Sequence, residues 1–155
     1  MSGGPGIGQE APGFTLPDQH GVATSLSADR GAVLIVFFPA AFTPVCHDEL
    51  RQLRDVAATL PVLAISCDSM YVLRTLADIE HLDFSLLSDF WPHGDVARSY
   101  GAFNGVTGLA ERASFLVDAT GVVRGMWRSS PDRARDTADY LRLWEALGDT
   151  PDEVA

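Results

Sequence analysis

The sequence predicts an α/β fold: a central mixed β-sheet flanked by helices, preceded by an N-terminal β-hairpin. Short apolar runs alternate with segments whose apolar residues recur every three or four positions, as they do along one face of a helix. The runs 32–38 and 62–66 are apolar almost throughout, which is typical of strands buried on both faces of a sheet. The last two runs are joined by a short turn, which adds an antiparallel part at one edge.

Two pairs of predicted strands are joined by turns, and the other strands are single. The first pair flanks Asp18-Gln19-His20-Gly21 and the last pair flanks Asp118-Ala119-Thr120-Gly121, both of them turn-forming sequences. Pro39 ends the first long apolar run, because proline cannot donate a hydrogen bond to a neighbouring strand. In chain order the predicted strands are 14–16, 22–26, 32–38, 62–66, 84–87, 113–117 and 122–127.

Helical spacing of apolar residues marks the segments between and after these strands. The predicted helices are 46–60, 70–79, 95–100 and 137–147. Pro61 ends the first of them and Gly148 the last. The alternation predicts one domain over residues 1–155 with loose termini at 1–10 and 149–155, an arrangement compatible with a thioredoxin-like fold.

Charge and composition narrow the classes of function. The formal net charge of −10 argues against binding to nucleic acid or to an anionic membrane surface, because both favour a basic protein face. No apolar run reaches the roughly 18 residues that a membrane-spanning helix needs. Residues 1–8 lack the positive and apolar parts of a signal peptide, so we expect a cytoplasmic protein.

The segment that carries the chemistry is Pro39-Ala40-Ala41-Phe42-Thr43-Pro44-Val45-Cys46. It leaves the carboxyl end of a buried strand, the edge of an α/β sheet at which sites form. Cys46 falls in the first turn of the next helix, where unpaired N–H groups and the helix dipole favour an anion, so the reactive thiolate is favoured there. The Thr43 hydroxyl can accept a hydrogen bond from the sulfur side or donate one to a peroxide oxygen. Pro39 and Pro44 stiffen the loop and limit water near the sulfur.

Glu49 lies one helical turn after Cys46, and on its own its carboxylate would disfavour a thiolate. A cation is therefore expected between the two groups. Arg112, which opens the strand 113–117, is the best candidate. A guanidinium can pair with Glu49 and still direct N–H donors at the sulfur and at a peroxide.

These residues resemble the peroxiredoxin signature P-x-x-x-T-x-x-C, here Pro39, Thr43 and Cys46. The stretch that begins at Arg112 looks like the one that carries the family's second-site arginine, and residues 86–94 resemble the one-cysteine alkyl hydroperoxide reductase E type of actinobacteria. The resemblance implies a thiol-dependent peroxidase with no metal or other cofactor. In it the Cys46 thiolate attacks a hydroperoxide, Thr43 and Arg112 stabilise the developing charge, and the cysteine becomes a sulfenic acid.

The resemblance also implies partners for the reaction. The substrates would be hydrogen peroxide and organic hydroperoxides, and an external thiol would regenerate the cysteine. In actinobacterial relatives the resemblance implies one of two reductants. One is mycothiol acting with a mycoredoxin-like protein, which is related to glutaredoxin, and the other is a thioredoxin-like protein. Family members usually form dimers, so a homodimer is expected.

Cys67 follows the strand 62–66, at the same sheet edge as Cys46. It is a possible resolving cysteine that forms a disulfide with Cys46 if the two Cα atoms lie within about 7 Å. The family's usual resolving positions lie elsewhere and hold no cysteine here, which favours a buried cysteine outside the reaction. The spacing of the two cysteines gives no zinc site.

Three other functions remain open from the residues alone. A thiol–disulfide oxidoreductase of the thioredoxin kind needs a nearby second cysteine, but Cys46 is followed by His47-Asp48-Glu49. A cysteine hydrolase needs a base, which would have to be His47, His81 or His93. A redox-sensing protein or holdase would use the same sulfenic acid, and only turnover with a reductant separates it from a peroxidase.

Overall fold

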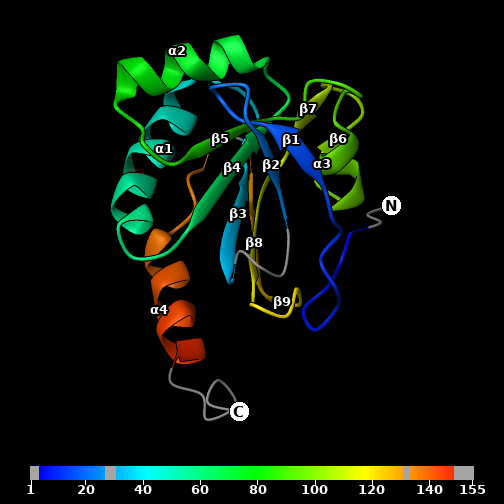
Figure 1. Cartoon of the computed structure of the whole chain (residues 1–155), viewed down its shortest axis with the longest axis vertical. Helices are drawn as coiled ribbons and strands as arrows, with labels where there is room; N and C mark the ends of the chain where they lie inside the picture. The colour runs from blue at the N-terminus through cyan, green and yellow to red at the C-terminus, as the bar shows by residue number, and fades with distance from the viewer. Residues whose placement is uncertain (1–3, 27–30, 131–132, 149–155) are drawn as a thin grey trace.

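A computed structural model describes residues 4–26, 31–130 and 133–148. Its centre is a five-stranded sheet with the strand order β5-β4-β3-β8-β9 (Figure 1). Strands β3, β4 and β5 are parallel, and β8 and β9 continue the sheet as antiparallel neighbours, as predicted. The strands of this sheet are β3 (Val33–Phe37), β4 (Val62–Ser66), β5 (Ser85–Ser88), β8 (Arg112–Val117) and β9 (Val123–Ser129).

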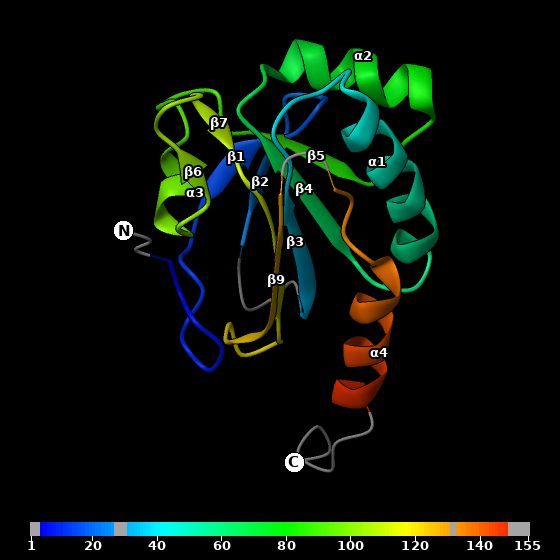
Figure 2. The same cartoon turned by 180° about the vertical axis from the view of Figure 1, so that it is seen from behind.

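Helices cover both faces of the sheet, as the two views show (Figure 1 and Figure 2). Successive residues of β3 point to opposite faces. Leu34 and Val36 pack in the cluster that contains residues of α1, α2 and α4, whereas Ile35 and Phe37 pack in the cluster that contains residues of α3. Both clusters are buried, which explains why β3 is apolar throughout. The helices are α1 (Pro44–Ala57), α2 (Met70–Glu80), α3 (Asp95–Ser99) and α4 (Thr137–Gly148).

Two small hairpins complete the described chain. The predicted N-terminal hairpin is confirmed as β1 (Thr15–Pro17) paired with β2 (Ala23–Ser25). A second hairpin, β6 (Phe103–Asn104) with β7 (Leu109–Ala110), was not predicted. Its strands are too short to show a period, and the Asn104 side chain holds its turn by accepting hydrogen bonds from the N–H groups of residues 106 and 107.

Helix α1 differs from its predicted bounds at both ends. It begins at Pro44, two residues earlier than predicted, because the proline's missing N–H is not needed in the first turn. It ends at Ala57 rather than at residue 60, because the chain closes in a tight turn in which the Thr59 N–H donates to the Val56 carbonyl at 2.9 Å. Cys46 is therefore the third residue of the helix and remains in its first turn.

Part of the segment 1–10, predicted to be loose, is hydrogen-bonded to the first residue of β9. The Gly8 N–H donates to the Val123 carbonyl at 2.8 Å, and the Val123 N–H donates to the Gln9 carbonyl at 2.9 Å. Residues 1–3 and the tail 149–155 lie outside the described residues. Within the described ranges, no helix is both long enough and apolar enough to cross a bilayer.

Candidate active site

The loop between β3 and α1 is held in a bent conformation. The Ala41 N–H donates to the carboxylate of Asp68 at 2.9 Å, and the Ser66 hydroxyl donates to the same oxygen at 2.7 Å. Phe42 has a φ of 64°, in the left-handed region that large side chains rarely adopt. Backbone strain of this kind persists only where its surroundings impose it, and it is concentrated at functional sites. The bent loop delivers Cys46 to the edge of the sheet.

Arg112 lies between Cys46 and Glu49, as the sequence predicts. Its Nη2 donates to the Cys46 Sγ at 3.1 Å, and its Nη1 donates to Glu49 Oε1 at 2.6 Å. All three side chains are buried, with the sulfur-bearing residue fully covered. Helix α1 supplies Cys46 and Glu49 from adjacent turns, and the first residue of β8 supplies the arginine. One guanidinium thus contacts both the sulfur and the carboxylate.

A second buried arginine, Arg135, completes the group and was missed from the sequence. Its Nε and its backbone N–H donate to Glu49 Oε2 at 2.7 and 2.9 Å, and its Nη2 donates to Glu49 Oε1 at 2.7 Å. This is a two-pronged pairing of a guanidinium with a carboxylate, the strongest form of such a contact. Arg135 precedes α4 in a stretch rich in arginine and aspartate, where no local pattern distinguishes it from exposed neighbours.

An ionised carboxylate lies among the buried guanidiniums beside Cys46. Burial opposes ionisation of Glu49, but the hydrogen bonds and positive charge of Arg135, with the charge of Arg112, hold the pKa of Glu49 below its ordinary value. The carboxylate is therefore ionised at neutral pH. Both guanidiniums contact this carboxylate, and Arg112 also contacts the Cys46 sulfur.

Thr43 precedes α1, in the N-cap position, but its side chain does not cap the helix. Its hydroxyl donates to the Ala40 carbonyl at 3.0 Å, so the side chain is fixed within the loop. The hydroxyl oxygen retains lone pairs that can accept a hydrogen bond from a peroxide. The predicted donation from Thr43 to a peroxide would require this bond to Ala40 to be exchanged.

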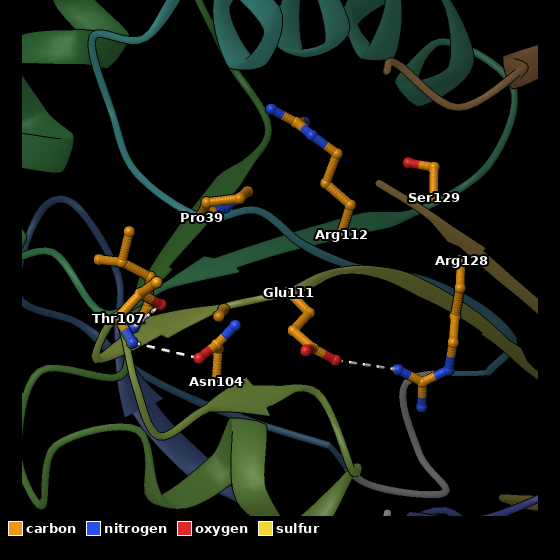
Figure 3. A pocket seen from close by; sticks show the side chains of 9 residues that line it. Pro39, Asn104, Thr107, Glu111, Arg112, Arg128 and Ser129 are labelled. Atoms are coloured by element: carbon orange, nitrogen blue, oxygen red, sulfur yellow. Dashed lines mark hydrogen bonds and ion pairs between the residues drawn. The ribbon is translucent and has the colours of Figure 1, made fainter. Parts of the chain in front are cut away.

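A pocket of about 320 Å³ adjoins this group (Figure 3). Pro39 and Arg112 line it, and Leu109 with its neighbours in the β6–β7 hairpin forms another wall. Glu111 and Arg128 also line it and form an ion pair at 3.6 Å. Figure 3 shows the Arg112 side chain pointing toward α1 and away from that ion pair. The pocket therefore leads from the surface to the arginine that holds the sulfur.

Cys67 is buried directly after β4. Burial, with the nearby carboxylate of Asp89, raises the pKa of the Cys67 thiol to about 11. The thiol is therefore protonated at neutral pH, which makes it a poor nucleophile. A resolving role for Cys67 remains a prediction.

Two of the histidines that follow Cys46 in the sequence, His47 and His93, contact other groups. The His47 Nδ1 lies 3.8 Å from Glu80 Oε2, and the His93 Nε2 lies 2.6 Å from the Gly108 carbonyl oxygen. Neither contact involves Cys46, and the buried His47 Nε2 has no hydrogen-bond partner among the described residues. Within the ranges that the structure covers, no cluster of three or more histidine, cysteine or acidic side chains could hold a metal ion.

The chain is similar in sequence to known proteins. The model of the AhpC/TSA family matches residues 7–126. Alkyl hydroperoxide reductase E from Mycobacterium tuberculosis is 43% identical over 145 residues, which cover 89% of this chain and 92% of that protein. A putative peroxiredoxin, Bcp, from Haemophilus influenzae is 36% identical over 151 residues, covering 88% of this chain and 96% of that protein.

A solved structure extends the likeness to three dimensions. The crystal structure of peroxidoxin BcpB from Mycobacterium tuberculosis superposes with a TM-score of 0.78 at 29% sequence identity. The superposition covers 93% of this chain and 97% of that one. This match confirms the predicted thioredoxin-like fold.

Proposed function

Because the chain belongs to the AhpC/TSA family and is a thiol-dependent peroxidase, we propose that Cys46 is the residue that reacts with the hydroperoxide. The observation that carries this assignment is the 3.1 Å contact between Arg112 Nη2 and the Cys46 Sγ. It joins a cysteine in the first turn of a helix to a buried cation, and both features favour the thiolate.

The reaction follows from this arrangement. The Cys46 thiolate attacks the terminal oxygen of the hydroperoxide, so that an S–O bond forms while the O–O bond breaks. The leaving alkoxide, or hydroxide when the substrate is hydrogen peroxide, takes a proton and departs as alcohol or water. Cys46 is left as a sulfenic acid, the first and reversible stage of cysteine oxidation.

Arg112 and Thr43 are the groups that stabilise this step in our proposal. Arg112 keeps N–H donors beside the sulfur, where negative charge shifts onto the breaking O–O bond. Thr43, fixed through Ala40, offers its hydroxyl at the start of the helix. Pro39 shields the sulfur from water on the pocket side.

Glu49 acts in support, because it fixes the guanidinium that touches the sulfur. Its carboxylate accepts hydrogen bonds from Arg112 and from Arg135, and all three side chains are buried. A guanidinium held in this way cannot turn away from Cys46 without leaving a buried carboxylate partly unpaired, which is costly.

The pocket supports reduction of organic hydroperoxides as well as hydrogen peroxide. Its volume of about 320 Å³ exceeds what hydrogen peroxide requires, and Leu109 and Ala110 give it an apolar wall. We place the organic group of the substrate there, with the peroxide entering between Pro39 and Arg112.

Regeneration, assembly and location complete the proposal. Because Cys67 is buried and its pKa is raised, the sulfenic acid is returned to the thiol by an external reductant, either mycothiol with a mycoredoxin-like protein or a thioredoxin-like protein.

Exposed aromatic side chains at Phe42, Phe90 and Trp91 offer apolar surface to a second copy, in support of a homodimer. We propose that the enzyme acts in the cytoplasm.

The test compares the two cysteines. We expect Cys46→Ser to abolish turnover of hydrogen peroxide and of cumene hydroperoxide in the presence of a thiol reductant. Cys67→Ser should retain turnover to within about twofold, since its thiol takes no part in the first step. Turnover that survives Cys46→Ser would overturn the assignment.

A further inference from the structure

A pair of buried hydroxyl groups lies at the far end of the Arg135–Glu49–Arg112 group. Arg135 Nη1 donates to Ser114 Oγ at 2.9 Å, and Ser114 Oγ lies 2.7 Å from Tyr140 Oη. From these contacts we infer that Tyr140 is a positioning residue for the peroxide reaction, acting through Ser114 and Arg135 on the arginine that holds Cys46. The inference deepens the proposed function and rests on it.

Each contact in this series is a short hydrogen bond between buried side chains. Ser114 is fully buried and Tyr140 is 1% exposed. Ser114 stands two residues after Arg112 on β8, so both side chains leave the same face of the sheet. Tyr140 comes from α4, which lies on the same side of the sheet as α1 (Figure 2). Helix α4 is thereby connected to Cys46 in the first turn of α1.

The geometry of Arg135 explains why the hydroxyl pair matters. Its Nε and Nη2 are both used by Glu49, whereas Nη1 donates to Ser114. Without an acceptor there, a buried guanidinium N–H would lose its partner, and the planar group could tilt to find another. Any tilt displaces Glu49, and with it the guanidinium of Arg112. Contacts at both ends of the planar Arg135 guanidinium hold its orientation.

Tyr140 is suited to fix Ser114 because it is rigid itself. Its ring packs edge-on against Trp127, with ring centres 4.9 Å apart and an interplanar angle of 78°. Serine can rotate among staggered side-chain positions, and the hydrogen bond to a fixed phenol selects one of them. Burial raises the pKa of Tyr140, so its hydroxyl stays neutral and retains its proton.

Tyr100 provides a matched control. It too is fully buried, and its hydroxyl donates to the Pro12 carbonyl at 2.7 Å. It packs in the other core cluster, which contains α3 and not α1 or α4. Tyr100→Phe therefore removes a buried tyrosine hydrogen bond of the same length without disturbing the residues around Cys46. A purely structural role for Tyr140 predicts that the two substitutions act alike.

The experiment measures two properties of Cys46 in full-length protein: the rate of its single-turnover reaction with hydrogen peroxide, and the pH profile of its alkylation by iodoacetamide in a Cys67→Ser background. We expect Tyr140→Phe to slow the peroxide reaction roughly fivefold, as loss of one hydrogen bond implies, and to displace the alkylation profile to higher pH. Tyr100→Phe should leave both within about twofold, although both variants lose similar thermal stability.

Ser114→Ala is a second variant that tests whether Tyr140 acts on Arg135 through Ser114. It should slow the reaction by about the same factor, and adding Tyr140→Phe to it should change little, because the two hydroxyls act in series. An unchanged rate and profile in Tyr140→Phe, or equal effects of Tyr140→Phe and Tyr100→Phe, would overturn the inference. Failure of the unsubstituted enzyme to react with peroxide would instead refute the proposed function.

Discussion

Arg112 contacts the Cys46 sulfur with one amino group of its guanidinium, at 3.1 Å, and the Glu49 carboxylate with the other, at 2.6 Å. A single planar side chain therefore couples the proposed nucleophile to the buried carboxylate. A lysine cannot contact both groups in this way, since its ammonium is a compact charge without the two amino groups of a planar guanidinium.

Arg112→Lys should keep a positive charge and still lose most of the activity. We expect the single-turnover rate with hydrogen peroxide to fall about 100-fold or more, the usual effect of losing a donor at a site of developing charge. Arg128→Lys is the control, because Arg128 lines the same pocket and is half exposed. It should change the rate by less than about twofold. Retention of full activity in Arg112→Lys would remove the arginine from the mechanism.

Glu49→Gln should destabilise the fold as well as slow the reaction. Removal of this carboxylate leaves two buried guanidiniums without their anion, a loss of about 3–5 kcal/mol in the free energy of unfolding. Urea unfolding at neutral pH measures it. Glu111→Gln, at a half-exposed ion pair, should cost less than about 1 kcal/mol. Equal costs at the two positions would contradict the account.

The same carboxylate predicts how stability depends on pH. Because the folded-state pKa of Glu49 is lowered from 4.5, its contribution to stability is fully present above that pH. The contribution is lost as the pH falls through the lower folded-state value, since the unfolded chain binds the proton first. Urea unfolding in acid should thus show a smaller loss of stability in Glu49→Gln than in the unsubstituted protein. Parallel losses would show that Glu49 does not titrate in this way.

Cys67 should be slow to react. In a Cys46→Ser variant it is the remaining cysteine, and its pKa of about 11 predicts little alkylation by iodoacetamide near pH 8. The rate should rise only as the pH approaches that value, whereas the urea-unfolded chain should react at once. Rapid alkylation of the folded variant at about pH 8 would indicate an accessible thiolate and would revive a resolving role.

The pocket predicts how substrates are discriminated. Leu109→Ser makes its apolar wall polar, so the rate with cumene hydroperoxide should fall about tenfold while the rate with hydrogen peroxide stays the same. Val106→Ser is the matched control, because Val106 lies in the same hairpin, is almost wholly exposed, and does not line the pocket. A parallel fall with both peroxides would mean that Leu109 supports the fold instead.

Much of the site was predictable because it is local in sequence. Pro39 and Thr43 lie on the loop between β3 and α1, and Cys46 lies in the first turn of α1. Apolar runs locate both elements without tertiary information. Arg112 needed more than periodicity. The requirement for a cation near Glu49 made Arg112 the best candidate, and the family resemblance implied the same residue.

The features that were missed depend on long-range contacts. Arg135 is buried because the connection from β9 to α4 passes over Glu49, 86 residues earlier in the chain, and nothing in its neighbourhood encodes that crossing. The inward position of Tyr140 follows from helical spacing, whereas its hydrogen bond to Ser114 depends on how α4 docks. The β6–β7 hairpin is too short to leave a periodic pattern.

The central claim, that Cys46 becomes a stable sulfenic acid, is tested most directly by intact-protein mass after one equivalent of cumene hydroperoxide, with and without dimedone. We expect one dimedone adduct, located on Cys46, in the unsubstituted protein and in Cys67→Ser, and none in Cys46→Ser. Loss of two hydrogen atoms without an adduct would show a Cys46–Cys67 disulfide. That result would contradict regeneration by an external thiol acting directly on the sulfenic acid.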